Sequence, residues 1–256
     1  NLLTHHRNNL KTSADKDFLD SLKNEKIDDS AKIIANADKV LNNEFNILGN
    51  GPYRFEDKIN WSTDFKGGTW LKGSYNELLL SLYTDFPNNE HIIGDIKFPW
   101  DFNKHLFFYD LATAYAITGE EKYAIKFVEI IEEWWIENPF KNNLAWCETL
   151  IVFQRAIAWL QSMRIFIHSE NITPQFYLKF AGSLYNHLEF IEENYELSVK
   201  ATNHLIGELA AVIAITTSFP EFDSSEASFE RAVELLVEET QKQIHDDGVQ
   251  FERSVS

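Results

Sequence analysis

The sequence has 256 residues and a mass of 29.8 kDa, and its 44% hydrophobic and 14% aromatic content can fill the core of a globular domain. Its 23 basic and 40 acidic residues give a formal net charge of −17, which would repel a polyphosphate backbone, so no nucleic acid is expected as a partner. One cysteine excludes an internal disulfide framework, and no apolar run reaches the ~20 residues that a membrane-spanning helix needs.

The first part of the chain is polar and prone to form helix. The stretch AKIIANADKVLNN has apolar residues at a three-and-four spacing, which predicts one amphipathic helix. From Gly49 to Gly68, glycines at both ends and one proline indicate a loop with at most a short strand. We therefore divide a single domain into a helical lead-in (1–50), a loop or short strand (51–69) and a series of helical hairpins (70–256).

Helical periodicity continues from residue 70 almost to the end of the sequence. The predicted helices are Trp70–Tyr83, Phe102–Ile117, Glu120–Glu137, Ala145–Ile167, Pro174–Tyr195, Asn203–Ser218 and Ser225–His245. Between the second and third of them, Gly119 is placed as a C-terminal cap, which predicts a helical hairpin. Serial antiparallel helices without a fixed repeat period favour an all-α fold of the α/α toroid type over a helical solenoid.

Two charges share one face of the helix predicted in NLAWCETLIVFQRAIAWLQSM. Glu148 and Arg155 lie on the same face as Val152 and Trp159, two turns apart, which is too far for the usual one-turn pair. If that face is buried, each charge needs another partner, because an unpaired buried charge is prohibitive. The residues alone favour a structural ion pair with a neighbouring helix over a polar ligand in a cleft.

The apolar helix predicted in TNHLIGELAAVIAI opens on polar side chains. Thr202 or Asn203 fits the N-cap position, and the residues alone favour that interpretation. The alternative is functional: the free N–H groups of a helix N-terminus, the amide of Asn203 and the imidazole of His204 would together bind a carboxylate, such as that of an acidic sugar.

Other motifs are weak. The sequence has no H-E-x-x-H, G-x-G-x-x-G or P-loop pattern and no pair of C-x-x-C motifs, so we predict no metal and no cofactor. The carboxylates Asp101, Glu148, Glu208 and Glu252 could supply a glycosidase pair, but the sequence does not give their separation.

Six stretches resemble, in order, the heparinase II/III-like polysaccharide lyases: GDIKFPWDFNKH, AYAITGEEKYA, NPFKNNLAWCETLIVFQRAIAWL, NHLIGELAAV, FPEF and DGVQFERS. The resemblance runs from about Gly94 to the end. It implies an incomplete α/α toroid, normally followed by a β-sandwich domain that this sequence does not contain. It also implies an acidic polysaccharide substrate, such as heparan sulfate or alginate, cleaved by β-elimination.

The resemblance carries over to particular residues. It assigns Asn203 to neutralising the uronate carboxylate, with His204 as its partner and a possible base. It moves Glu148 and Arg155 to the wall of a cleft, with Trp146 and His105 as sugar contacts. Because the substrate is anionic and the chain acidic, we expect basic residues such as Lys104 and Arg155 to gather in one groove.

One part of the family pattern is missing. The stretch matching DGVQFERS normally leads into a Tyr-His pair whose tyrosine is the catalytic acid, and we expect that tyrosine beyond Ser256, which would make the chain an inactive fragment. The alternatives are a glycoside hydrolase on the same toroid, using two carboxylates, and a non-catalytic helical domain that binds carbohydrate or protein. A polymeric substrate implies a secreted or periplasmic enzyme. The sequence does not indicate an oligomeric state.

Overall fold

The computed structural model describes residues 2–9, 29–64, 68–69, 96–197, 203–249 and 251. The predicted helix Trp70–Tyr83 lies outside the described residues, as do Thr202 and Glu252.

The N-terminal part contains more strand than the sequence predicts. After α1 (Leu2–Asn9), helix α3 (Ser30–Leu41) buries Ala37 and Val40, which confirms the predicted amphipathic helix. Then β1 (Glu44–Ile47) pairs antiparallel with β2 (Asn50–Arg54), and β3 (Thr63–Asp64) pairs with β4 (Gly68–Thr69). The turn between β1 and β2 has positive φ at both Leu48 and Gly49, the geometry of a type I′ hairpin turn.

The predicted helix Phe102–Ile117 is wrong as a single element. It is divided between α5 (Lys97–Phe102) and α6 (Phe108–Thr118). His105, between them, has a φ of 58°, a left-handed conformation that a continuous right-handed helix cannot contain. This break buries the side chain of His105 instead of leaving it on a helix surface.

The later helices agree with the predictions within a few residues. They are α7 (Lys122–Glu137), α8 (Thr149–Phe166), preceded by the short 3-10 helix η1 (Leu144–Trp146), α9 (Pro174–Glu193), α10 (Asn203–Ser218) and α11 (Ser225–Gln243). Gly119 caps α6 with a φ of 70°, and its N–H donates to the oxygen of Tyr115 at 2.8 Å, which confirms the helical hairpin.

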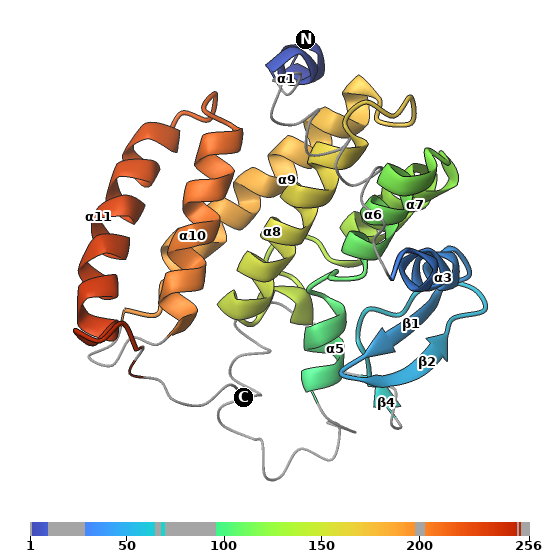
Figure 1. The fold of residues 1–256 in the computed structure, drawn as a ribbon, viewed down its shortest axis with the longest axis horizontal. Coiled ribbons are helices and arrows are strands. Elements are labelled where there is room, and N and C mark those ends of the chain that lie inside the picture. Colours follow the sequence, from blue (N-terminus) through green and yellow to red (C-terminus); the bar gives the residue numbers. More distant parts are fainter. Residues whose placement is uncertain are drawn as a thin grey trace.

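The helices form an open row instead of a closed ring (Figure 1). Helices α3, α6, α8 and α10 pack side by side in that order. Helix α7 packs on α6, α9 packs on α8 and α10, and α11 packs on α10. This double layer of antiparallel helices confirms the all-α, incomplete α/α toroid, with the two small β hairpins beside α3 and α5 as an addition.

Helices α8 and α10 approach closely because α10 contains a glycine at the contact. A Cβ atom placed on Gly207 would lie 2.5 Å from Cζ of Phe153 on α8, closer than two carbon atoms can stand. The aromatic ring of Phe153 therefore occupies the space that a side chain at 207 would need. This contact holds the N-terminal half of α10 against α8.

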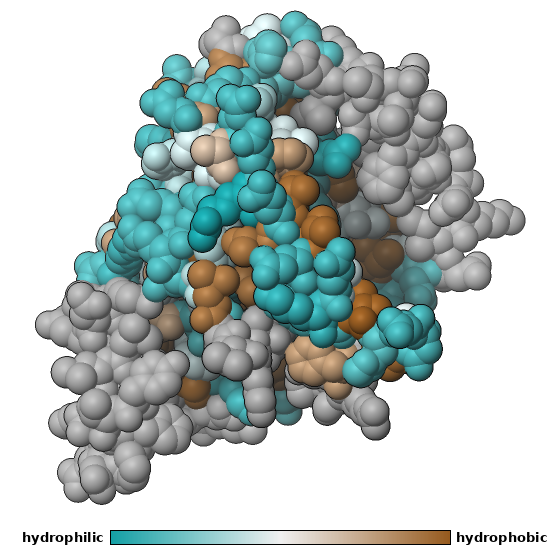
Figure 2. Space-filling model, turned by 90° about the vertical axis from the view of Figure 1, so that its left-hand side faces the viewer, coloured by the Kyte–Doolittle hydropathy of each residue, from teal (hydrophilic) through white to brown (hydrophobic). Residues whose placement is uncertain are grey.

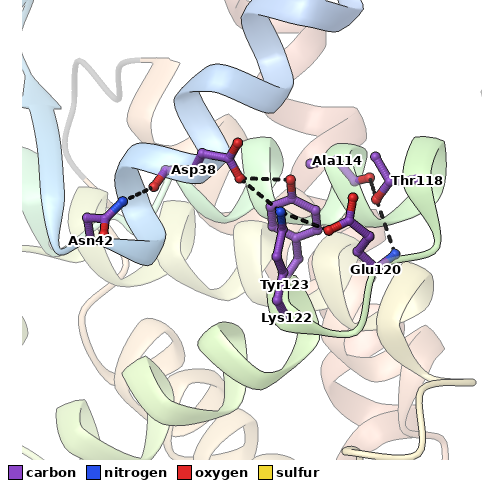
Figure 3. Close-up of polar contacts among 7 residues, drawn as sticks. All are labelled: Asp38, Asn42, Ala114, Thr118, Glu120, Lys122 and Tyr123. Atoms are coloured by element: carbon purple, nitrogen blue, oxygen red, sulfur yellow. Dashed lines mark hydrogen bonds and ion pairs between the residues drawn. The ribbon is translucent and has the colours of Figure 1, made fainter.

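The turn between α6 and α7 is tied to α3 by a small polar network (Figure 3). Asp38 of α3 accepts a hydrogen bond from the hydroxyl of Tyr123 at 3.0 Å and pairs with Lys122 at 3.3 Å. Lys122 also pairs with Glu120 at 2.8 Å. The lead-in helix is thereby held to the first helical hairpin by polar contacts as well as by its apolar face.

The side of the molecule that carries α11 has hydrophobic side chains at its surface (Figure 2). On α11 itself, Phe229 is 40% exposed and Val237 is 54% exposed. Among the described helices, none combines the length and the apolar character required to span a membrane.

Candidate active site

The two residues predicted to be catalytic open helix α10. Asn203 is its first residue and is exposed; His204 follows and its side chain is 39% exposed. Asn203 therefore stands in the first turn of α10, and Thr202, the other residue predicted to cap the helix, lies outside the described residues. In this turn the backbone N–H groups have no partner within the helix and the positive end of the helix dipole favours an anion.

His204 is paired with a carboxylate that follows helix α9. Its Nδ1 lies 3.0 Å from Oε2 of Glu196. The backbone N–H of Glu196 in turn donates to Oε2 of Glu208 at 2.9 Å, and Glu208 lies one turn beyond His204 on α10. Glu208 is only 1% exposed, so its carboxyl fixes the segment that carries Glu196 from inside the fold. Two contacts thus hold the imidazole: His204 pairs with Glu196, and the backbone of Glu196 is bound by Glu208. Both His204 and Glu208 lie on α10.

A third carboxyl comes from the start of α8. Glu148 caps α8, with its side chain accepting from the N–H of Leu150, and it interacts electrostatically with His204 and Glu196. Burial raises its pKa. The N-termini of α8 and α10 and the segment after α9 therefore bring Glu148, Glu196, His204 and Glu208 into one group of interacting charges, which we call the carboxylate–histidine cluster.

The pKa of Glu208 is raised to about 7, chiefly by burial; the hydrogen bond from the Glu196 N–H opposes this shift, and the nearby charges of Glu196 and Glu148 add to it. At neutral pH this carboxyl is therefore divided between its protonated and ionised forms. Burial also raises the pKa of Tyr195, which is next to Glu196. Its hydroxyl has no hydrogen-bond partner among the described residues. Tyr195 is thus a poor proton source in this state.

The only cysteine lies between the cluster and the core. Cys147 is buried, and burial together with the charge of Glu148 raises the pKa of its thiol to about 12. The thiol is consequently protonated at neutral pH and has little nucleophilic character.

Arg155 is not at the wall of a cleft. It is fully buried, and its guanidinium stands between Trp134 and Trp146, at 4.4 and 4.9 Å from the two ring centres. Its Nη1 donates to the backbone oxygens of Asn103 and Ala145, and its Nε donates to Nε2 of His187 at 2.8 Å. The predicted burial of this helical face is confirmed, but its charge is compensated by carbonyl groups and aromatic rings instead of by a carboxylate.

His105 and Trp146 are also buried, with 0% and 1% of their surface exposed, so a sugar cannot reach them in this structure. The ring of His105 accepts a hydrogen bond at Nδ1 from the indole of Trp159 at 2.9 Å, so its proton is on Nε2. Burial, followed by the charge of Arg155, holds its pKa well below the ordinary value. This structure therefore presents neither His105 nor Trp146 as a sugar contact and does not place Arg155 at a cleft wall; the three side chains lie buried in the core beneath η1.

Lys104 and Arg155 also do not meet in the predicted basic groove. Lys104 is mostly buried and pairs with Asp101 at 3.1 Å, while Arg155 points into the core. Within the same described ranges, no group of histidine, cysteine and acidic side chains has the arrangement of a metal site.

Sequence reasoning missed Glu196. It follows the end of α9 and belongs to no periodic pattern, so only the fold brings it to His204, eight positions later in the chain. Glu208 and Glu148 had been recognised as scattered carboxylates, and the structure joins both to the cluster.

Comparison with known proteins gives related sequences and folds. A heparin-sulfate lyase from Pedobacter heparinus is 27% identical over 63% of this chain, and one from Bacteroides thetaiotaomicron is 30% identical over 60%. The crystal structure of heparan sulfate lyase HepC from Pedobacter heparinus shares the fold, with a TM-score of 0.72 and 22% identity over 98% of this chain.

These relatives are much longer than the chain. It spans 25% and 22% of the two curated lyases and 36% of the solved structure. The sequence model described as Heparinase II/III N-terminus matches residues 1–256, the whole of the chain. The chain therefore belongs to the heparinase II/III family and corresponds to its N-terminal helical region.

Proposed function

We propose that the chain is the helical part of a lyase that cleaves a heparan sulfate-like polysaccharide by β-elimination. The observation that carries the proposal is the exposed start of α10, where Asn203 and the paired His204 stand together. The relatives, named as heparin-sulfate lyases, support the substrate class. Because such polymers lie outside the cytoplasm, the proposal includes a secreted or periplasmic location.

The reaction is difficult because the proton at C5 of the uronate is only weakly acidic. Its removal leaves an electron pair that forms the C4–C5 double bond, while the C4–O bond breaks and the leaving oxygen takes up a proton. Negative charge develops on the carboxylate next to C5 during this step. In the proposal, the Asn203 amide and the N–H groups of the first turn of α10 stabilise that charge.

His204 is proposed as the base for one substrate epimer. Its pairing with Glu196 through Nδ1 favours the tautomer that carries its proton on Nδ1, which leaves the lone pair on Nε2 to accept the C5 proton. The leaving oxygen would receive its proton from the tyrosine expected past the stretch matching DGVQFERS. Glu196 then acts as a positioning residue and Asn203 as the residue that contacts the carboxylate.

The cluster is acidic, and an acidic site disfavours an anionic substrate. The raised pKa of Glu208 offsets part of this effect, because a protonated carboxyl removes one negative charge near the substrate. In the proposal, cations outside this cluster compensate the rest of the substrate's charge.

The test is ultraviolet absorbance of the unsaturated product, measured on heparan sulfate, chondroitin sulfate and alginate. The chain would be compared with a version extended through the adjoining coding sequence. We expect absorbance to rise on heparan sulfate with the extended version, and Asn203→Ala and His204→Ala each to lower kcat by about 100-fold or more. His245→Ala removes an exposed histidine from the end of α11 and should leave the rate unchanged.

A second candidate is a glycoside hydrolase, which the group of Glu148, Glu196 and Glu208 favours. Glycosidic hydrolysis uses two carboxyl groups, one of which acts as an acid with a raised pKa, and the pKa of Glu208 is raised to about 7. It predicts new reducing ends without absorbance, and loss of that activity in Glu208→Gln. Rising absorbance that survives Asn203→Ala would contradict the role proposed for Asn203.

A further inference from the structure

A groove of 710 Å³ lies between the C-terminal end of α7 and the middle of α9, in the outer layer of the helices. Its size is that of a pocket for a small ligand or a few sugar rings. The lining residues are mostly aromatic or polar and include Trp135, Asn138, Phe140, Gly182, Ser183 and Asn186. None of the residues of the carboxylate–histidine cluster lines it, so the groove is separate from the proposed cleavage site.

The floor of the groove is rigid. Trp134 and Trp146 lie there with ring centres 5.9 Å apart, and Phe140 meets the edge of Trp146 at 5.0 Å. Beneath them the guanidinium of Arg155 contacts both indoles. Trp134 and Trp146 are themselves buried, so a ligand would meet the partly exposed rings of Trp135 and Phe140, which do not need to be ordered when it arrives.

Two polar atoms at the wall lack a partner among the described residues. Oδ1 of Asn138 is an unsatisfied acceptor on a residue that is only 2% exposed, and Nε1 of Trp135 is an unsatisfied donor. A buried polar group without a partner is unfavourable, and a ligand that carries both donors and acceptors would remove that penalty. Asn186 and Ser183 add further amide and hydroxyl groups on the α9 side.

The wall of α9 is open because it carries a glycine. Gly182 is in the middle of a 20-residue helix, where glycine is unfavourable, and a Cβ atom built there meets nothing within 4 Å. The missing side chain therefore leaves free space beside the aromatic floor. No packing requirement of the described structure accounts for a glycine at this position.

The charged residues of the groove favour an uncharged ligand over a sulfated one. Its charged lining residues are Lys179 and Glu132, one of each sign, in a chain whose formal net charge is −17. Nearby Lys141 is already paired with Glu193 and Glu189. A heavily sulfated chain would find little compensation here, whereas uncharged pyranose rings bring apolar faces for stacking together with hydroxyl and acetamide groups.

We propose that this α7–α9 groove binds an unsulfated, N-acetylated stretch of glycan, separately from the cleavage site at α10. The groove would hold a weakly charged part of a polysaccharide while a uronate elsewhere on the same polymer reacts. This binding does not depend on turnover, so it can be measured whether or not the chain is a lyase.

The test is a titration of the chain with a tetramer of β-1,4-linked N-acetylglucosamine, followed by tryptophan fluorescence. We expect saturable binding that Gly182→Phe weakens by about tenfold or more, because the new ring occupies the open groove. Asn186→Ala, which removes an amide without adding bulk, should weaken it by about threefold. Ala227→Phe adds the same ring on the exposed surface of α11 and should change the affinity by less than about twofold.

A sulfated heparin tetrasaccharide serves as the second ligand. We expect its binding to be insensitive to Gly182→Phe. The proposal is overturned if the acetylated tetramer shows no saturable binding, if Gly182→Phe and Asn186→Ala both leave its affinity unchanged, or if the sulfated ligand is the one that Gly182→Phe displaces.

Discussion

At the scale of single residues, the molecule places titratable groups in environments that change their chemistry. Glu208 is the clearest case, because burial raises its pKa to about 7 while its ionised form holds the N–H of Glu196. In the unfolded chain the same carboxyl has its ordinary pKa, so between pH ~4.5 and 7 the folded state binds more protons than the unfolded state. The free energy of unfolding therefore falls as the pH rises through this window.

Glu208→Gln should remove that dependence. The amide keeps an oxygen that can accept from Glu196, so we expect the variant to be more stable than the parent at pH 8 by about 2 kcal/mol and to have a flatter profile between pH 5 and 8. Urea unfolding at four pH values measures this. Glu230→Gln, an exposed carboxylate on α11, should leave the slope unchanged. Parallel profiles for Glu208→Gln and the parent would show that Glu208 does not titrate in this window.

At the scale of elements, two glycines within helices separate the effect of side-chain packing on stability from the effect of helix propensity. Gly207 faces the ring of Phe153, whereas Gly182 faces open space. Alanine favours helix over glycine by about 1 kcal/mol, so any loss at position 207 must come from the contact between α8 and α10.

We predict opposite effects for the two alanine substitutions. Gly207→Ala should destabilise the chain by about 1–3 kcal/mol, because the ring of Phe153 must move, and Gly182→Ala should stabilise it by about 0.5–1 kcal/mol. Thermal unfolding of the two variants side by side gives the comparison. A stabilising Gly207→Ala would mean that α8 and α10 can separate without loss.

Some elements could be predicted from local patterns in the sequence, whereas two chain reversals and one contact at the site could not. Gly119, the three-and-four spacing of α3 and the helical periodicity of α7 to α11 are local signals, and those helices are confirmed. The break at His105 and the turn at Leu48 rest on positive φ values at residues that rarely adopt them, so no local rule indicates either. At the site, Asn203 and His204 were found by resemblance, whereas the contact of Glu196 with His204 depends on how α9 returns to α10.

At the scale of the whole molecule, charge limits which polymers the chain can hold by itself. Its formal net charge is −17, and the two residues expected to attract a polyanion do not face one, because Lys104 pairs with Asp101 and Arg155 is buried. Attraction of a polyanion depends on the number of cations that neutralise it, and this attraction weakens steeply with salt.

We therefore expect the chain to elute from immobilised heparin below about 0.15 M salt. Replacing two negative charges by two positive ones through Glu230→Lys and Glu234→Lys, both on the exposed face of α11, should delay elution measurably. Retention of the unaltered chain well above that salt concentration would reveal a cationic surface formed by residues outside the described ranges.

The buried thiol of Cys147 has a practical consequence. A protonated sulfhydryl enclosed between η1 and α8 reacts with alkylating or disulfide reagents only when that junction opens. Since no other sulfhydryl exists in the sequence, a cysteine introduced at the surface would be the sole fast-reacting handle for a dye or crosslinker. The slow rate at which the Cys147 thiol is modified would then report how often the structure beside Glu148 opens.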